Sequence, residues 1–334
     1  MLTTGSDYAL LGDIGGTNAR FALARVGADA GLLLESVTTY SVADFPSLAA
    51  AARHYADSMS VHASFGVFAV AGRVEGDEAR MTNHAWVVSA TRVREALGLD
   101  ALYLVNDFVA QAASIRLLRT SDTVALGAPN WHPSIDGTPR TFAILGPGTG
   151  LGMGGLLVRG DRHYPLATEG GHASFAPGTP EEIEILRRLS ATYGRVSNER
   201  LVSGGGLVNI HRALSEIAGT DPGPLQPPDI TARAAEGDYP SMRAIDIFCA
   251  VFGAIAGDLV LTLGAWDGVF LSGGMVPRML PALQHSGFRQ RFEGKGRYSP
   301  AMATVPTLAV LHPQPGLLGA AALAGDRESL EGAR

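Results

Sequence analysis

Cysteine is almost absent from this chain of 334 residues, which contains a single one, Cys249. One cysteine cannot form an internal disulfide, nor a zinc site built from clustered thiolates. Its neighbours Phe248 and Ala250 are apolar, so we expect a buried thiol that only fills space. The lack of disulfides fits a reducing compartment, and we predict a cytoplasmic protein.

Positive charge is also scarce. The sequence has 26 Lys and Arg residues against 32 Asp and Glu residues, a net charge of −6, and it contains no basic block. Nucleic-acid binding depends on Lys and Arg residues that neutralise many phosphates, so we expect no nucleic-acid partner. The slight excess of acidic over basic residues suits a protein that binds a small anion at one local site.

Sequence signals for secretion and for membranes are missing. The N-terminus does not combine a basic stretch with an apolar stretch and a cleavage site, so no signal peptide is expected. The most apolar segment, Ile247–Leu263, is interrupted by two glycines and by Asp258. We interpret it as a buried helix that is too short and too broken to span a bilayer, and we predict no membrane partner.

Familiar nucleotide and hydrolase motifs are absent as well. No G-x-x-x-x-G-K-[ST] occurs, so a nucleotide would not be held by a P-loop. Gly150–Gly155 matches G-x-G-x-x-G, but the Leu156–Val158 stretch that follows is typical of a strand and not of the helix in a dinucleotide fold. The glycines after Ser203 and Ser272 lack the G-x-S-x-G pattern of a hydrolase nucleophile.

Two glycine-rich turns are present instead, Asp13–Asn18 and Gly146–Gly150, each between two short apolar runs. This pattern predicts a strand, a tight turn and a second strand. Glycine permits a positive φ and a close approach to a ligand, and the N–H groups with the hydroxyls of Thr17 and Thr149 would form an anion-binding nest. Asp13 adds a carboxylate for a nucleotide's metal ion. Either turn alone is more simply a hairpin, whereas the pair favours one polyphosphate held between them.

Strands and helices alternate along the chain, which favours an α/β protein whose sheets are covered by helices. A second unit begins near Thr141 with its own glycine turn, so the two halves resemble an ancient duplication of one architecture. A late strand and helix could return to the first domain. Besides the strands that flank the two turns, the predicted strands are 65–70, 101–105, 268–272 and 307–311, and the predicted helices are 46–58, 90–97, 108–118, 180–193, 206–217, 230–236, 241–263 and 317–324.

Asn106 and Asp107 directly follow a predicted strand, at the end where α/β sheets bind ligands. A carboxylate there can accept the proton of a hydroxyl group during phosphoryl transfer. The alternative is that Asn106 or Asp107 caps the next helix, which is the simpler account of an isolated pair.

Glu169 and His172 lie on a glycine-rich turn, at a spacing that directs a carboxylate and an imidazole toward one small polar ligand. His172 could instead have a structural role, and a metal role is weak because no second histidine or cysteine stands at ligand spacing. Glu199 by itself is typical of a solvated charge or a capping acid.

Seven stretches of the sequence resemble those of the bacterial ATP-dependent glucokinase family. Their order and rough spacing agree from about Tyr8 to Leu323, nearly the whole chain. One difference is Arg73, which stands where the family commonly has proline. The stretches are Leu11–Arg20, Met81–His84, Val105–Phe108, Gly146–Gly152, Glu169–His172, Arg195–Arg200 and Ser272–Arg278.

The resemblance implies an actin-like or hexokinase-type fold, which is ribonuclease H-like, with two domains and a cleft between them. The small α/β domain would comprise residues 1–117 and 307–330, and the large α+β domain residues 118–306. The implied reaction is ATP-dependent phosphorylation of D-glucose at its 6-hydroxyl group, the first step of glycolysis, by direct in-line transfer. A homodimer is expected.

The resemblance also implies roles for individual residues. Asp107 would be the general base toward the 6-hydroxyl group, and Asp13 would hold Mg²⁺ through water. The sugar would be bound by Asn83, Asn106, Asp107, Glu169, His172 and Glu199. MgATP would lie against Asp13, Gly15, Gly16, Thr17, Asn18, Gly148 and Thr149, with its adenosine near Gly273 and Gly274.

Two other classes of function remain as alternatives. Another hexose or N-acetylhexosamine kinase, of the repressor/open-reading-frame/kinase family, would carry a cysteine-rich zinc motif that this chain lacks. A catalytically silent sugar sensor or an actin-like assembly protein would not need Asp107, and no helix-turn-helix extension is evident.

Overall fold

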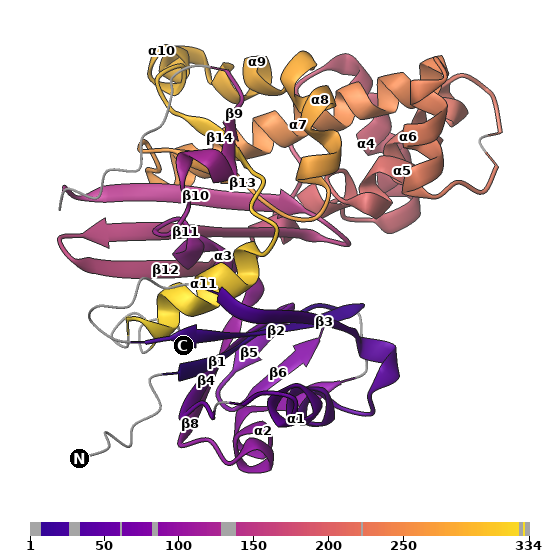
Figure 1. The fold of residues 1–334 in the computed structure, drawn as a ribbon. Helices are drawn as coiled ribbons and strands as arrows, with labels where there is room; N and C mark the ends of the chain where they lie inside the picture. Colours follow the sequence, from indigo (N-terminus) through magenta and orange to yellow (C-terminus); the bar gives the residue numbers. More distant parts are fainter. Residues whose placement is uncertain are drawn as a thin grey trace, which may run out of the picture.

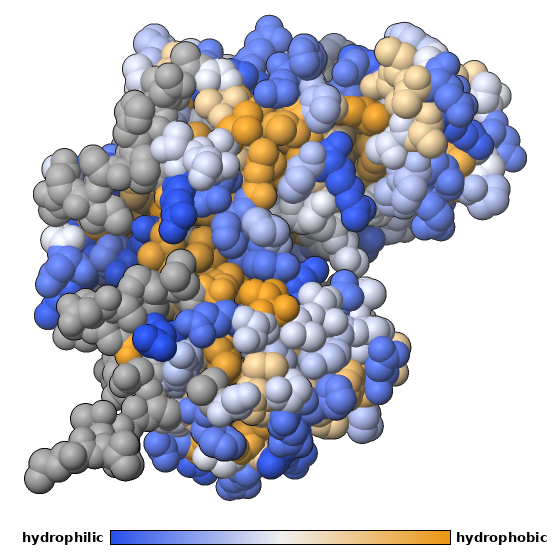
Figure 2. All heavy atoms as spheres, in the orientation of Figure 1, coloured by the Kyte–Doolittle hydropathy of each residue, from blue (hydrophilic) through white to orange (hydrophobic). Residues whose placement is uncertain are grey.

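The computed structural model of the chain describes residues 8–26, 34–60, 62–81, 86–127, 138–221, 223–326 and 330. Over these residues the chain forms two lobes, each built around a β-sheet (Figure 1). Helices α3 (Asp107–Ser114) and α11 (Pro315–Ala324) lie between the two sheets. The surface is indented on the right-hand side of the view, where the lobes meet (Figure 2).

The smaller lobe contains a five-stranded sheet with the order β3-β2-β1-β4-β8. The first three strands of this order are antiparallel neighbours, whereas β1, β4 and β8 run parallel. A separate three-stranded sheet has the order β5-β6-β7. The elements of this lobe are β1 (Tyr8–Ile14), β2 (Asn18–Arg25), β3 (Leu34–Ser41), α1 (Leu48–Asp57), β4 (Phe65–Val70), β5 (Gly72–Glu75), β6 (Glu78–Met81), β7 (Val87–Ser89), α2 (Ala90–Leu97) and β8 (Ala101–Asn106).

The larger lobe contains a six-stranded sheet with the order β12-β11-β10-β13-β14-β9. Apart from β9 at the edge, this order repeats that of the smaller lobe, so the predicted duplication of architecture is confirmed. Its strands are β9 (Thr123–Ala125), β10 (Arg140–Pro147), β11 (Leu151–Arg159), β12 (Arg162–Thr168), β13 (Val269–Leu271) and β14 (Thr307–Val310). Its helices are α4 (Pro180–Tyr193), α5 (Gly204–Ile217), α6 (Pro227–Ala235), α7 (Tyr239–Leu263), α8 (Val276–His285), α9 (Phe288–Glu293) and α10 (Ser299–Met302).

The domain boundary predicted at residue 307 does not match the sheets. β14 pairs in parallel with β13 and antiparallel with β9, so residues 307–310 lie in the sheet of the larger lobe. The segment that returns to the smaller lobe is α11, which packs on β1 and β4. Because β14 and α11 are both apolar and are joined by a short connection, the sequence does not show that the chain passes from one sheet to the other between them.

Helices α3 and α11 join the two lobes through apolar side chains on different faces. Val109 of α3 packs with the smaller lobe, whereas Phe108 packs with the sheet of the larger lobe. α11 makes the same division, with Leu317 in the first cluster and Leu318 in the second. Residues 316–324 are all buried, as is typical of a helix surrounded on every side.

Helix α7 is longer than the sequence interpretation expected. The helix extends beyond the predicted segment Ile247–Leu263, and its 25 residues are long and apolar enough to cross a membrane, so length does not exclude a span. However, 72% of its most apolar window is buried inside the protein. The prediction of a buried helix is therefore confirmed, and Cys249 is buried within it as expected.

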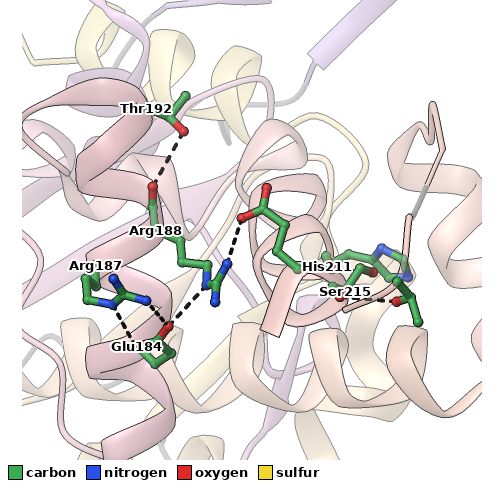
Figure 3. Close-up of polar contacts among 8 residues, drawn as sticks. Glu184, Arg187, Arg188, Thr192, His211 and Ser215 are labelled. Atoms are coloured by element: carbon green, nitrogen blue, oxygen red, sulfur yellow. Dashed lines mark hydrogen bonds and ion pairs between the residues drawn. The ribbon is translucent and has the colours of Figure 1, made fainter. Parts of the chain in front are cut away.

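An ion-pair network at the surface links α4 to α5 (Figure 3). Arg187 and Arg188 donate hydrogen bonds to Glu184 at 2.8 and 3.1 Å, and Arg188 also lies 3.5 Å from Glu216 of α5. The bonds from Arg187 are the main cause that lowers the pKa of Glu184 to about 2. Because these side chains remain in contact with water, we expect the network to contribute little to stability.

The crossing of α3 and α11 gives a test of how the lobes are joined. A Cβ at Gly319 would overlap the backbone carbonyl group of Ala110, and neither helix can move without disturbing the core. We expect Gly319→Ala to lower the free energy of unfolding by about 1–3 kcal/mol in chemical denaturation. Gly287→Ala is the matched control, because a Cβ there would have its nearest neighbour at 3.7 Å. Equal stabilities of the two variants would contradict the close crossing.

Candidate active site

The sheet of the smaller lobe brings two predicted site residues to one edge. β1, β4 and β8 are parallel, and their registers place Ile14 beside Val70 and Val70 beside Asn106. Asp13 near the end of β1 and Asp107 just after β8 therefore lie at the same carboxyl edge. This is the edge at which open α/β sheets bind ligands.

Asp107 is the first residue of α3 and lies among other acids. Burial, together with the negative charges of Asp13 and Glu169, raises its pKa to about 7, against the lowering effect of a hydrogen bond from the Phe108 N–H. A carboxyl group with this pKa gains and loses a proton near neutral pH, as a general base requires. The structure thus brings Asp13 and Glu169 close enough to Asp107 for their charges to act on it.

Asp13 has a neighbour on each side. Nη1 of Arg20, on the adjacent strand β2, donates a hydrogen bond to Oδ2 of Asp13 at 3.1 Å. Gly316 in the first turn of α11 lies against the same carboxylate. Burial raises the pKa of Asp13, and Arg20 opposes this effect. The side chain of Asp13 keeps 19% of its surface exposed, so a ligand can reach it.

Asn106 acts as the cap of α3. Its side-chain oxygen accepts hydrogen bonds from the N–H groups of Phe108 at 2.9 Å and Val109 at 3.4 Å. Its Nδ2 donates to the carbonyl oxygen of Gly72 at 3.1 Å. The capping alternative is therefore confirmed for Asn106, and a contact with sugar, which stays a prediction, would have to use the second amide hydrogen.

Glu169 directly precedes the short 3₁₀ helix η3 (Gly170–His172), which ends with His172 and packs on β11. Both residues are exposed. The carbonyl oxygen of His172 accepts a hydrogen bond from Nη1 of Arg195 at 2.7 Å, which holds the backbone of this turn while the imidazole stays accessible.

Glu199 lies in the 3₁₀ helix η4 (Asn198–Arg200), beside η3. The N–H of Asn198 donates to the carbonyl oxygen of Ala173 at 2.9 Å, which joins the two short helices. Oε2 of Glu199 accepts a hydrogen bond from the N–H of Leu151 at 3.0 Å. The half-buried Glu199 is therefore held at the start of β11, next to the second glycine turn.

Both glycine-rich turns are hairpins, between β1 and β2 and between β10 and β11, as predicted. The expected positive φ does not occur at Gly148, where a Cβ would have no neighbour within 4 Å. Gly273 does have a positive φ, 88°, and a Cβ there would lie 2.8 Å from the carbonyl oxygen of Pro147. The second hairpin and the Gly273 turn are thus packed together.

Sequence patterns did not identify several residues that support these turns. Oγ of Ser272 donates a hydrogen bond to Oε1 of the buried Gln111, on α3, at 2.5 Å. The N–H of Gly204, at the start of α5, donates to the carbonyl oxygen of Gly148 at 2.9 Å. Ser203, which caps α5, could have indicated the helix start, whereas Gln111 carries no signal in the sequence.

Asn83 and Arg73 are the two remaining residues that the family resemblance relates to the sugar site. Asn83 lies outside the described residues, so its role stays a prediction. Arg73, where the chain departs from the family pattern, is exposed and pairs with Glu75 at 3.0 Å. It directly follows Gly72, whose carbonyl oxygen accepts the hydrogen bond from Asn106.

The residues present can accommodate a magnesium ion that arrives with a nucleotide. Among the described residues, no group of three or more His, Cys, Asp or Glu side chains could hold a metal ion by itself. Mg²⁺ in kinases is usually held by one or two carboxylates together with phosphate oxygens and waters. The accessible carboxylate of Asp13, at the edge of the first glycine turn, fits this donor set.

Two duplicated α/β lobes with acids at the sheet edge between them are typical of the actin-like fold, to which sugar kinases belong. Comparisons with known proteins agree. The chain is 64% identical over 327 residues to a glucokinase of Stenotrophomonas maltophilia, which covers 98% of each chain. A crystal structure of a glucokinase from an Antarctic psychrotroph matches with a TM-score of 0.84 and 33% identity, over 95% of this chain and 98% of that one.

A family model described as Glucokinase matches residues 10–327, and the chain belongs to this family. Its reaction is the ATP-dependent phosphorylation of glucose, which sets aside the silent sensor and the assembly protein. A more distant structure, a ROK-family glucokinase of Streptomyces griseus in complex with glucose and AMPPNP, has a TM-score of 0.60 at 19% identity over 95% of this chain and 98% of that one. That likeness concerns the fold alone.

The raised pKa of Asp107 makes stability depend on pH. Its pKa is about 7 in the folded chain and about 4 in an unfolded chain, so stability is lost as pH rises from the lower value to the higher one. Asp107→Asn removes this loss. In thermal melts we expect the variant to exceed the parent in Tm, by more at pH 8 than at pH 5. A difference that does not change with pH would argue against the raised pKa.

Proposed function

We propose that Asp107 is the general base of this kinase and accepts the proton of the glucose 6-hydroxyl group. The observation that carries the proposal is a carboxyl group with a pKa of about 7 at the carboxyl edge of the sheet. At neutral pH a large fraction of such a group is ionised, and it is more basic than an ordinary aspartate. As the hydroxyl oxygen attacks the γ-phosphorus atom, its proton passes to Asp107, the bond to ADP breaks, and ADP leaves with the electron pair.

Glucose is bound in this proposal by side chains from both lobes. The support comes from η3 and η4, which are joined through Asn198 and Ala173, and from Glu169 directly before η3, whose charge acts on Asp107. A site that pairs sugar hydroxyl groups rejects analogues that lack them, typically by about 10⁴-fold or more. The proposed sugar-binding residues are Asn83, Asn106, Asp107, Glu169, His172 and Glu199.

The nucleotide lies between the two hairpins in this proposal. Open space where a Cβ would stand at Gly148 and Gly274 leaves room for a ligand to approach the backbone. Asp13 would hold Mg²⁺ through water, and the ion, when bound, neutralises phosphate charge. The remaining nucleotide contacts are assigned to Gly15, Gly16, Thr17, Asn18, Thr149 and Gly273.

Water competes with glucose as the acceptor of the phosphoryl group. We propose that the lobes close on the sugar and exclude water, because phosphoryl transfer needs positioning more than covalent chemistry. A homodimer, which rests on the family resemblance, and a cytoplasmic location, which rests on the single cysteine, complete the proposal.

The role of Asp107 is tested by changing its carboxylate to an amide. Asp107→Asn keeps the size of the side chain and can still hydrogen-bond to glucose, so sugar affinity measured by calorimetry should change little. Turnover should fall by about 10²-fold or more. In the parent, kcat/KM should decline as pH falls below about 7, and the variant should lose this inflection. A folded variant with near-normal turnover would remove Asp107 from the role.

The sugar pocket is tested through its exposed residues. Glu169→Ala and His172→Ala should each raise the KM for glucose by about tenfold or more, with a much smaller change in the KM for ATP at saturating glucose. Glu236→Ala, an exposed glutamate just after α6, is the matched control. Equal weakening of both substrates, or a large loss of Tm, would favour a structural role for the two residues.

A further inference from the structure

One contact in the site leaves no room for a side chain. Gly316 lies directly against the carboxylate of Asp13, where an added Cβ would stand 2.7 Å from its Cγ and 2.9 Å from each carboxylate oxygen. Non-bonded carbon atoms normally lie about 3.5–4.0 Å apart. A methyl group at residue 316 therefore cannot share this space with the carboxylate in its observed place.

The opposite side of Asp13 is defined by β2. Asp13 and Arg20 are direct partners in the antiparallel register of β1 and β2, and the guanidinium group of Arg20 bonds Oδ2 of Asp13 at 3.1 Å. The carboxylate is thus confined between this cation and the first turn of α11, whose N-terminal end carries the positive end of the helix dipole. Both neighbours attract the charge, and the lack of a side chain at Gly316 sets how close it can come to the helix.

Helix α11 is itself placed by the helix that carries Asp107. Gly319, one turn after Gly316, crosses α3 at the backbone carbonyl group of Ala110. Ala110 is one turn after Asp107. Each of the two crossing helices is therefore associated with one acid at its first turn. The first turn of α3 carries Asp107, and the first turn of α11 lies against Asp13.

We propose that Gly316 is a positioning residue for phosphoryl transfer: by leaving room for the carboxylate of Asp13, it sets where this group stands relative to Asp107. The inference rests on the proposed roles of those two acids. The element responsible is the C-terminal helix, which is distant in sequence from both acids, and glycine is required because any Cβ would displace the carboxylate.

Gly316→Ala tests the proposal because only the end of one side chain has to move. The variant should fold, with a Tm close to that of the parent and unchanged glucose binding in calorimetry. Its kcat should fall by about tenfold or more, because a displacement of about 1 Å at a reacting centre can cost 10²-fold, while the KM for glucose stays the same. Binding of the magnesium complex of AMPPNP should weaken, and binding of metal-free AMPPNP should not. Gly287→Ala, remote from the site, should match the parent throughout.

A double-mutant cycle separates this inference from the proposed function. Asp13→Ala removes the carboxylate, so adding Gly316→Ala to it should cause no further loss of turnover or of analogue binding. Parental turnover in Asp13→Ala would reject the role of Asp13 itself. If Asp13→Ala is impaired, then a parental Gly316→Ala, additive losses in the double variant, or failure of Gly316→Ala to fold would each overturn the positioning role of Gly316.

Discussion

The packing of α3 and α11 between the two sheets is the constraint on which the rest of the structure depends. These helices form parts of two apolar clusters, one with each sheet, so neither lobe has a complete core without them. Because α3 is buried in this way, its first residue, Asp107, is partly shielded from water. Loss of hydration is the main cause of its raised pKa. The contact that joins the lobes thus also produces the basic group between them.

Placing several acids close together at the sheet edge is electrostatically unfavourable. Asp13 and Glu169 both raise the pKa of Asp107, and Arg20 opposes the effect of burial on the pKa of Asp13. A region under selection only for stability would avoid such a cluster. Functional sites often keep unfavourable electrostatics because the ligand relieves them, and a polyhydroxyl sugar with a metal-bound nucleotide can supply the missing partners.

Local patterns in the sequence were sufficient for most elements and for the class of protein. β4, α2 and α4 have the predicted bounds, because their caps and apolar periods are strong and local. β3, the β5-β6-β7 sheet and β12 were not predicted, because they are short or largely exposed, and pairing with neighbours stabilises them more than their own residues do. The change of sheet after β14 depends on tertiary contacts and leaves no local signal.

The residues of the candidate site also divide into those that local sequence patterns predict and those that depend on tertiary contacts. The turns of Asp13 and Gly148 and the strand end at Asp107 follow from glycine spacing and position along a sheet, whereas Gln111 and Gly316 act through partners far away in the chain. Asn106 was predicted with two alternative roles, and the hydrogen bonds establish the capping role. A pattern identifies residues that are unusual by themselves; it cannot identify an ordinary glutamine or a helical glycine whose importance comes from its neighbour.

The position of α11 near the C-terminus has a consequence for synthesis of the protein. Residues 316–324 complete the apolar clusters of both lobes, yet they leave the ribosome after every strand of the two sheets. Until then, the apolar faces that α11 covers remain open to water and to chaperones. A chain that stops before α11 retains all of its proposed substrate contacts but lacks the helix that completes both clusters, so we expect phosphorylating activity only once translation has passed this helix.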